Sequence, residues 1–293
     1  MTDREFKAII DELWNTFWSS GISNPISVVE QMTYLIFFKM LEEQENLKDK
    51  KAKIFKKERE SFFAGRDELR WSNFKQLAPD AMLKIYREKV FPLLGSINAA
   101  FNDATCLITK PSLLDTAVQT LDKMDFSDGS DRKGDIYEYM LSKLATSGTN
   151  GQFRTPRHII DMMVRLIKPT PQDKICDPAC GTGGFLCGAY HYILESNTSE
   201  EMKEVSPILG DKLSDSDRHN IDQKVFYGRE FDITMFRIGL MNMILHNIRP
   251  YNVKHTDSLS KDSQEEITYS VVLANPPFTG SLDESDIDLH LTS

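Results

Sequence analysis

The sequence predicts an α/β protein in which an N-terminal helical domain precedes an open parallel sheet. Up to about residue 135, apolar residues recur at the spacing of amphipathic helices. Beyond that point, short apolar segments alternate with helical segments, as in strands joined by crossover helices. A glycine-rich turn follows the first apolar segment, where such sheets bind their ligands. We therefore expect a helical domain over residues 1–135 and an α/β domain over residues 136–293.

The first domain is predicted to consist of successive helices. Apolar residues from Phe6 to Phe17 fall on one helical face, and a break at 21–25 precedes a second helix over about 26–45. Ser27 and Glu30 have the spacing of a capping box at its start. A loop is expected over 126–134, and further helices are expected over 80–90, 92–102, 112–124 and 135–145.

The second domain is predicted to contain four short strands. They are expected over residues 174–177, 225–228, 253–256 and 270–275. Helices are expected over 183–194 and 232–246, between the first three strands. Because a helix joins one strand to the next, the strands are expected to run parallel.

The composition is that of a globular protein, with 40% hydrophobic and 27% charged residues. The N-terminus lacks the pattern of a secretory signal, and the densest apolar run, 34–38, is too short to cross a bilayer. We therefore expect a cytoplasmic protein with no membrane partner. The four cysteines include no Cys-x-x-Cys pair, so reduced thiols are favoured and no metal site is expected.

The charge balance bears on nucleic-acid partners. The net charge is −9, whereas a protein that binds the DNA phosphates without a partner is usually basic. A local basic surface or a partner protein would then have to supply the contacts with the DNA phosphates. The charged segment 48–60 has two interpretations, a solvated face or a phosphate-contacting patch, and the solvated face is favoured.

The strongest motif is the turn Asp-Pro-Ala-Cys-Gly-Thr-Gly-Gly-Phe-Leu, residues 177–186. It follows a predicted strand and opens a helix, and its glycines let a ligand approach the backbone. The dinucleotide pattern fails because Leu186 stands where the third glycine would be, and no Gly-Lys-Ser/Thr of a P-loop follows. A turn without a ligand is the alternative.

A second motif, Asn275-Pro276-Pro277-Phe278, follows the fourth predicted strand directly. Two prolines end a strand because they cannot donate to the ladder. An amide and an aromatic ring are therefore expected at the same sheet edge as the glycine turn. A simple strand terminator is the alternative, but the glycine turn upstream disfavours it.

These motifs resemble a known family. The glycine turn is similar to the cofactor motif of class I S-adenosylmethionine-dependent methyltransferases, and Asn-Pro-Pro-Phe to the catalytic motif of amino-methylating DNA methyltransferases. Their order resembles the gamma class of adenine-N6 enzymes. Together with the segment Gly-Gln-Phe-Arg-Thr-Pro-Arg at 151–157 and the helical N-terminal region, they resemble type I restriction-modification methylation subunits over essentially the whole chain.

The resemblance implies a Rossmann-like domain that binds S-adenosylmethionine. The matching cofactor positions are Phe153, Thr155, Pro156, Asp177, Gly181, Thr182, Gly183, Glu230 and Asp257. By this match, Glu230 accepts hydrogen bonds from the ribose hydroxyls of the cofactor, and Asp257 accepts a hydrogen bond from its adenine amine. The alternatives are a surface glutamate at a helix start for Glu230 and a loop aspartate capping the next turn for Asp257.

The resemblance also implies site-specific methylation of adenine N6 in DNA. Asn275 and the Pro276 carbonyl would accept from the amine, Pro277 completes the motif, and Phe278 would stack on a base flipped out of the duplex. Cytosine C5 methylation would need a thiolate nucleophile, and no Pro-Cys dipeptide occurs. An RNA or protein-glutamine methyltransferase shares Asn-Pro-Pro, but the Gln-Phe-Arg-Thr-Pro segment and the helical region argue against it.

The implied partners are double-stranded DNA, a specificity subunit, a restriction subunit and a second methylation subunit. The sequence ends fifteen residues after Phe278, where the family's sheet would continue with about three more strands. A C-terminally incomplete methyltransferase domain is therefore expected, with an open edge at the fourth strand. The alternative function is a non-catalytic fragment that serves in cofactor binding or assembly.

Overall fold

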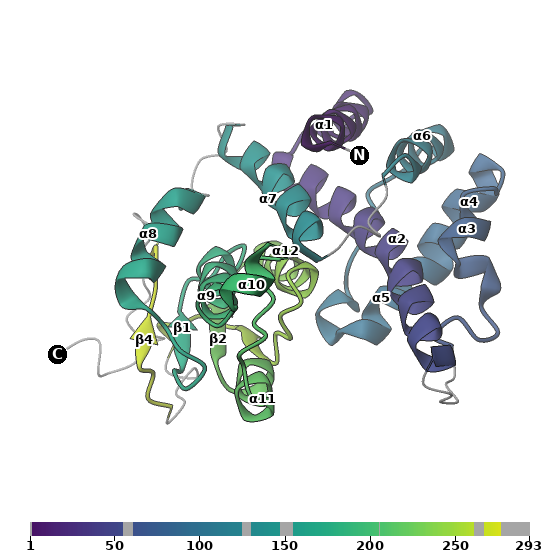
Figure 1. Ribbon diagram of the computed structural model, residues 1–293. Helices are drawn as coiled ribbons and strands as arrows, with labels where there is room; N and C mark the ends of the chain where they lie inside the picture. Colours follow the sequence, from purple (N-terminus) through teal and green to yellow (C-terminus); the bar gives the residue numbers. More distant parts are fainter. Residues whose placement is uncertain are drawn as a thin grey trace. The chain divides into compact units, whose positions relative to one another are not determined.

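The computed structural model describes residues 2–54, 61–124, 130–146, 155–204, 206–260 and 267–276. The chain forms two compact units, residues 1–147 and 148–293 (Figure 1). Helices make up the described part of the first unit, whereas the second combines a sheet with helices. In the described residues, no helix is both long enough and apolar enough to span a membrane.

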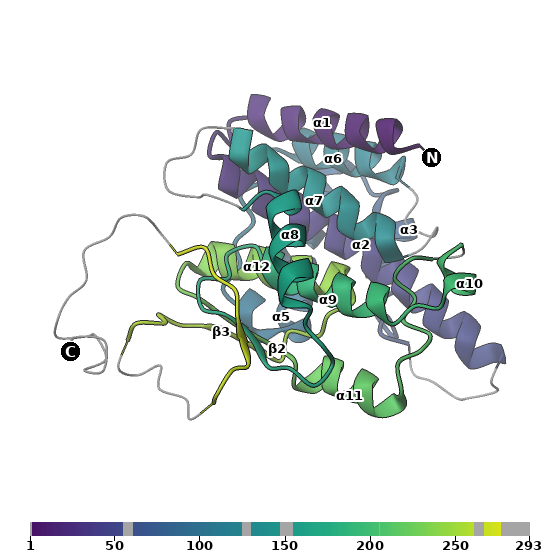
Figure 2. The ribbon, with the colours of Figure 1, turned by 60° about the vertical axis from the view of Figure 1, so that its left-hand side comes forward.

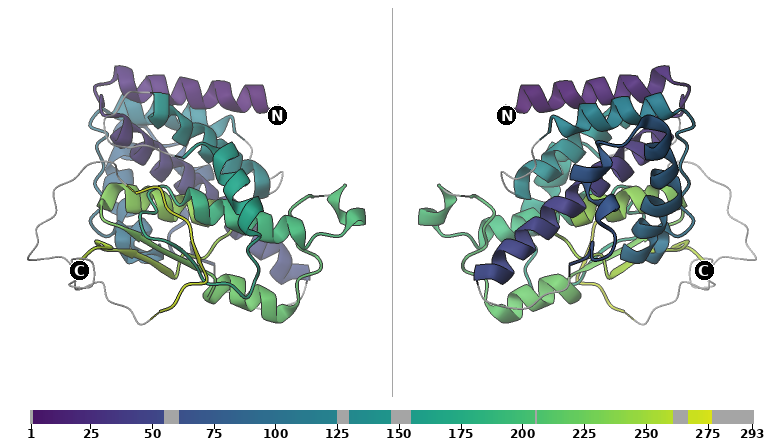
Figure 3. Two further views of the ribbon diagram at one scale, coloured as in Figure 1. Left: turned by 90° about the vertical axis from the view of Figure 1, so that its left-hand side faces the viewer. Right: turned by 90° about the vertical axis from the view of Figure 1, so that its right-hand side faces the viewer.

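The helices of the first unit pack through a core of apolar and aromatic side chains. The helix α1 contacts α2, α6 and α7 (Figures 2 and 3). The helix α4 packs on α6. The elements are α1 (Asp3–Ser19), α2 (Pro25–Ile54), η1 (Asp67–Leu69), α3 (Trp71–Phe74), α4 (Pro79–Ile85), η2 (Tyr86–Val90), α5 (Phe91–Ile97), η3 (Ala99–Phe101), α6 (Pro111–Asp122) and α7 (Ser130–Thr146).

Two predicted boundaries in this unit are wrong. The helix α2 (Pro25–Ile54) begins within one residue of the expected start, where the Asn24 side chain accepts a hydrogen bond from the Ile26 backbone N–H at 2.9 Å, but it continues to Ile54 and so passes the expected end at residue 45. Ser27 therefore lies inside the helix. The expected loop over 126–134 is also too long, because α7 begins at Ser130.

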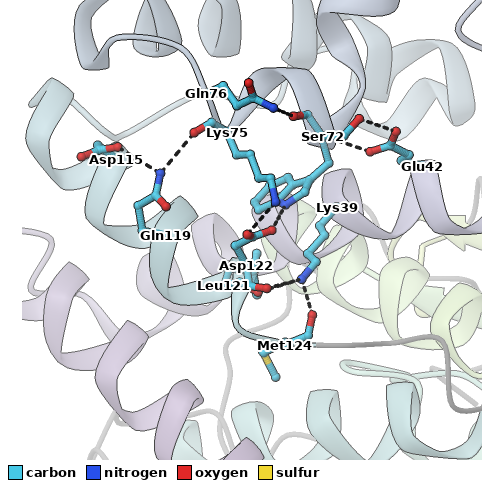
Figure 4. Close-up of polar contacts among 11 residues, drawn as sticks. Lys39, Glu42, Ser72, Lys75, Gln76, Asp115, Gln119, Leu121, Asp122 and Met124 are labelled. Atoms are coloured by element: carbon cyan, nitrogen blue, oxygen red, sulfur yellow. Dashed lines mark hydrogen bonds and ion pairs between the residues drawn. The ribbon is translucent and has the colours of Figure 1, made fainter.

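A buried lysine joins α2 to the end of α6. The Lys39 ammonium donates to the carbonyls of Leu121 at 2.9 Å, Asp122 at 3.4 Å and Met124 (Figure 4). The Asp122 carboxylate in turn accepts from the Trp71 indole N–H at 2.8 Å. Because the last carbonyls of a helix have no partner within it, Lys39 satisfies groups that burial would otherwise leave unpaired.

We expect Lys39→Met to lower the free energy of unfolding by about 1–3 kcal/mol, because it removes the donor from carbonyls at the end of α6. Urea unfolding measures the change. Lys123→Met is the matched control, since Lys123 forms an exposed pair with Glu12 at 3.1 Å and its loss should cost less than about 1 kcal/mol. Equal stability of the two variants would contradict the capping role of Lys39.

The second unit contains a four-stranded parallel sheet of order β3-β2-β1-β4. The predicted strands are all present, although their ends differ. The fourth covers two residues rather than six. The elements are α8 (Arg157–Ile167), β1 (Ile175–Asp177), α9 (Gly184–Ser196), α10 (Glu200–Lys203), α11 (Asp215–Gln223), β2 (Phe226–Glu230), α12 (Ile233–Leu245), β3 (Asn252–His255) and β4 (Val271–Val272).

The helices α8, α9 and α12 lie on one side of the sheet (Figure 2). The helix α9 packs on β1 and β2, and α12 packs on β2 and β3. The approach of α8 to α9 depends on Gly188, where an added Cβ would lie 2.6 Å from Cγ2 of Ile160. This layer fixes where α9 and α12 begin, and both begin at the carboxyl edge of the sheet.

Candidate functional site

The glycine turn lies between the end of β1 and the start of α9. Gly181 and Gly183 have φ of +49° and +73°, in the left-handed region that a side chain disfavours. The Cys180 N–H donates to the Arg229 carbonyl at 2.9 Å, and the Gly183 N–H donates to the Cys180 carbonyl at 2.7 Å. The turn is thus folded back on itself and tied to β2.

The helix α12 supports the turn from behind. An added Cβ at Gly239 would lie 2.4 Å from the Gly181 carbonyl oxygen, so only glycine allows this contact. The buried Asn242 amide donates to the Thr182 carbonyl at 2.8 Å. An added Cβ at Gly181 itself would meet nothing within 4 Å. The turn is packed against α12, and the Cβ direction of Gly181 faces open space.

Sequence reasoning missed Gly239 and Asn242. Both interrupt the apolar run of α12, from Ile233 to Leu245. A glycine and an amide within so apolar a helix are the available signals, because each needs a specific packing or hydrogen-bonding reason.

Two carboxylates lie beside the turn. Asp177, the last residue of β1, is 1% exposed and accepts from the Ala179 N–H at 3.2 Å. Burial raises the pKa of Asp177 to about 7; the Glu230 charge adds to this rise and the Ala179 N–H opposes it. Glu230, the last residue of β2, accepts from Gly181 N–H at 2.7 Å and from Asp232 N–H at 2.9 Å.

An exposed aromatic ring follows Glu230. Phe231 is 74% exposed, and its neighbour Ile233 is 37% exposed. An apolar surface next to a carboxylate suits a ligand that has both a flat ring and hydroxyl groups. Sequence reasoning missed Phe231, although an aromatic residue just after an acidic strand end was a usable signal.

The segment after β3 is tied to the glycine turn. Ser258 donates from its hydroxyl to the Pro178 carbonyl. The Asp257 carboxylate accepts from the Leu259 N–H at 2.9 Å, which is the turn-capping contact expected under the alternative interpretation. The structure therefore places Asp257 beside the β1 loop, with a local role already visible.

The strand β4 brings Asn275 to the same edge. It pairs in parallel with β1, with Cys176 opposite Val272, and the Leu273 N–H donates to the Cys176 carbonyl at 3.0 Å. Asn275 follows two residues later and is partly buried, whereas Pro276 is exposed. Pro277 and Phe278 lie outside the described residues.

The remaining predicted positions precede α8. Thr155 is partly buried and Pro156 directly precedes the helix, while Phe153 lies outside the described residues. An added Cβ at Gly184, the first residue of α9, would lie 3.1 Å from Cδ1 of Ile160. The first turns of α8 are therefore anchored on the helix that starts at the glycine turn.

Strand order reverses between β1 and β4, because β2 and β3 extend the sheet in the other direction. Ligands of open α/β sheets bind at such a switch point, beyond the carboxyl ends of the strands. With the glycine turn on one side and Asn275 and Pro276 on the other, the arrangement is that of a class I S-adenosylmethionine-dependent methyltransferase domain.

The chain belongs to the N-6 DNA Methylase family, which matches residues 128–290. The HsdM N-terminal domain matches residues 6–135. Over 285 residues the chain is 28% identical to the type I restriction enzyme EcoEI methylase subunit of Escherichia coli, covering 90% of this chain and 54% of the relative. It is 32% identical over 226 residues to the StySPI methylase subunit of Salmonella potsdam, covering 71% and 41%. The chain thus spans about half the length of these relatives.

Solved structures share the fold. A modification subunit of a putative type I restriction enzyme from Vibrio vulnificus YJ016 superposes with a TM-score of 0.73 at 20% identity, over 97% of this chain and 62% of that chain. A type I methyltransferase subunit from Streptococcus thermophilus gives a TM-score of 0.67 at 18% identity, over 95% and 64%. The fold therefore extends through both units.

We expect Asp177→Asn to stabilise the chain at pH 8 and much less at pH 5. The folded-state pKa of about 7 lies above the ordinary value of 3.8, so the folded chain holds an extra proton between them and stability falls as pH rises through that window. The gain at pH 8 should be on the order of a few kcal/mol.

Urea unfolding at the two pH values measures this gain, with Asp161→Asn on the exposed side of α8 as control. An equal gain at both pH values would contradict a buried, titrating Asp177.

Proposed function

We propose that this chain carries the cofactor site and catalytic motif of a site-specific adenine-N6 DNA methyltransferase, as part of a type I methylation subunit. The observation that carries the proposal is the pairing of β4 with β1, which brings Asn275-Pro276 and the glycine turn to one sheet edge. Membership of the N-6 DNA Methylase family supports it.

The residues at this edge fit S-adenosylmethionine, which supplies a methyl group already activated by its positive sulfur. The ligand is cationic at its sulfonium and ammonium groups, and two carboxylates, Asp177 and Glu230, border the turn. Open space at Gly181 leaves room for a close approach. In this proposal, Gly181, Thr182 and Gly183 shape the wall around the methionine part, with Phe153, Thr155 and Pro156 beside them.

Glu230 is proposed to accept from the ribose hydroxyls. Its two oxygens accept backbone N–H donors from Gly181 and Asp232, and each oxygen has a second lone pair for a hydroxyl. Phe231 would lie against one face of the adenine. Asp257 is proposed to accept from the adenine amine, since its loop is joined to Pro178 through Ser258.

Asn275 and Pro276 are proposed to act on the target amine. An adenine amine is a weak nucleophile because its lone pair is delocalised into the ring. The Asn275 side-chain oxygen and the Pro276 carbonyl can each accept one amine hydrogen. Two acceptors favour a pyramidal nitrogen and direct its lone pair, so the residues contribute alignment rather than a covalent intermediate. Pro277 would keep the segment rigid, and Phe278 would stack on the flipped base.

The proposed partners follow from this function. The substrate is double-stranded DNA, and a net charge of −9 argues that other subunits supply much of the phosphate contact. We propose a specificity subunit, a restriction subunit and a second methylation subunit as partners. The HsdM N-terminal domain match supports a type I assembly.

The alternative function is a non-catalytic cofactor-binding or assembly module. Calorimetric titration with S-adenosylmethionine tests the cofactor site in both functions, and micromolar affinity supports it. Methyl transfer from tritiated cofactor to unmethylated DNA, with and without the specificity subunit, separates an enzyme from a module that only binds.

We expect Asn275→Ala to reduce methyl transfer by at least about a hundredfold, since it removes an acceptor made for the reacting amine. Cofactor affinity should stay within about twofold, because loss of a group that serves only the transition state leaves ground-state binding intact. Radiometric transfer assays and calorimetry measure the two effects.

The matched control is Asn252→Ala, which removes an asparagine of β3 whose amide donates to the Gln223 carbonyl at 2.8 Å. It should retain methyl transfer. Loss of cofactor binding and methyl transfer together in Asn275→Ala would overturn the assigned role.

We expect Glu230→Gln to weaken S-adenosylmethionine binding by about tenfold to a hundredfold. The amide keeps only one acceptor oxygen, so either a backbone N–H or a ribose hydroxyl loses a charged partner. Calorimetry measures the change, with Glu200→Gln on exposed α10 as control. Unchanged affinity would remove Glu230 from the proposed site.

A further inference from the structure

The strand β4 is very short. It contains two residues, Val271 and Val272, and in the described sheet it pairs on one side only, with β1. Backbone bonds from Ser270 and Val271 to the Lys174 carbonyl, and from Leu273 to the Cys176 carbonyl, accompany this pairing. So short a strand specifies its register weakly through its own backbone pairing.

Side-chain burial opposes a shift by one residue most strongly. Leu273 is 1% exposed and Val272 is 57% exposed, so a shift by one would exchange a core residue for an exposed one. A shift by two keeps the same faces. It would move the end of the strand by about 6–7 Å, because each residue advances a strand by about 3.3 Å.

A side-chain contact at the opposite end of β4 opposes such a shift. The Ser270 hydroxyl donates to Oδ1 of Asp173 at 2.8 Å and accepts from the Lys174 N–H at 3.0 Å. Oδ2 of Asp173 accepts from the backbone N–H of Thr170 at 2.7 Å and from its hydroxyl at 2.8 Å. The carboxylate is therefore already oriented by the segment before β1, and Ser270, directly before β4, is the residue that meets it.

The protonation state of Asp173 suits this contact. Partial burial works to raise its pKa, but hydrogen bonds from Ser270 and Thr170 outweigh burial and hold the pKa below the ordinary value of 3.8. The carboxylate is ionised at neutral pH, and hydrogen bonds to a charged acceptor are stronger than neutral ones.

We propose that the Ser270–Asp173 hydrogen bond fixes the register of β4 on β1 and thereby positions Asn275 at the other end of the strand. Ser270 and Asp173 are positioning residues: they lie at the amino end of the strands, away from the glycine turn. This inference rests on the proposed function of Asn275.

The test compares Ser270→Ala, Ser270→Thr and Asp173→Ala in the methylation subunit assembled with its partner subunits. For Ser270→Ala and Asp173→Ala, we expect kcat for methyl transfer to fall on the order of tenfold to a hundredfold, since small misplacements of reacting groups have effects of that size. The KM and Kd for S-adenosylmethionine should stay within about twofold. Ser270→Thr keeps the hydroxyl and should restore kcat.

Ser196→Ala is the matched control, because it removes an exposed serine hydroxyl that donates to the Tyr192 carbonyl at 2.8 Å on α9. Faster amide hydrogen exchange at Val271 and Leu273 in Ser270→Ala, but not in Ser196→Ala, would support a loosened strand. This measurement remains informative even if a variant loses stability.

The outcomes separate the two proposals. If Asn275→Ala abolishes methyl transfer but kcat of Ser270→Ala equals that of Ser196→Ala, the register inference is wrong and the proposed function stands. A fall in thermal stability with kcat unchanged has the same meaning. If Asn275→Ala retains methyl transfer, the proposed function itself fails.

Discussion

The candidate site depends on the parallel pairing of β1 with one strand on each side. On one side, β2 supplies Glu230, which accepts from the Gly181 N–H, and the Arg229 carbonyl, which accepts from Cys180. On the other side, β4 carries the chain toward Asn275. Because all four strands are parallel, the loops after β1, β2 and β4 all leave the sheet at its carboxyl edge. Losing either pairing would separate residues that lie far apart in the sequence, such as Gly181 and Glu230, which are 49 positions apart.

The glycine turn is rigid on its protein side. Its carbonyls and N–H groups are held by α12, β2 and the turn itself, and Gly239 allows a backbone contact that any side chain would block. A preformed turn loses little conformational freedom when a ligand binds, so more of the interaction energy appears as affinity. The same arrangement buries the Asp177 carboxyl, which is unfavourable because desolvation disfavours its ionised form until a cation lies nearby.

The sequence predicted the fold class, the strands and the edge that carries both motifs. Apolar periodicity and a glycine turn can be read from neighbouring residues. Such local patterns are enough to predict a helix or strand when one of its faces is buried. The helix α11 was not predicted because only Ile221 of its residues is buried, so it has almost no apolar face. The helix α8 was not predicted, although its apolar residues recur at helical spacing and bury Ile160 and Val164. Asn242 could not be assigned a partner, since its bond to Thr182 joins residues 60 positions apart.

The contacts that join β1 to β2 are more extensive than those that join β1 to β4. The pair β1–β2 is stabilised by the glycine turn, by the hydrogen bond from the Gly181 N–H to Glu230 and by the packing of α9. The part of the site proposed to bind the cofactor is therefore well supported. The pair β1–β4 has a strand of only two residues, with the Ser270–Asp173 hydrogen bond at its amino end. Local opening draws on the least supported contacts first. The half that would act on the target amine is therefore the half more easily displaced, and substitutions along β4 should affect the rate of transfer more than cofactor affinity.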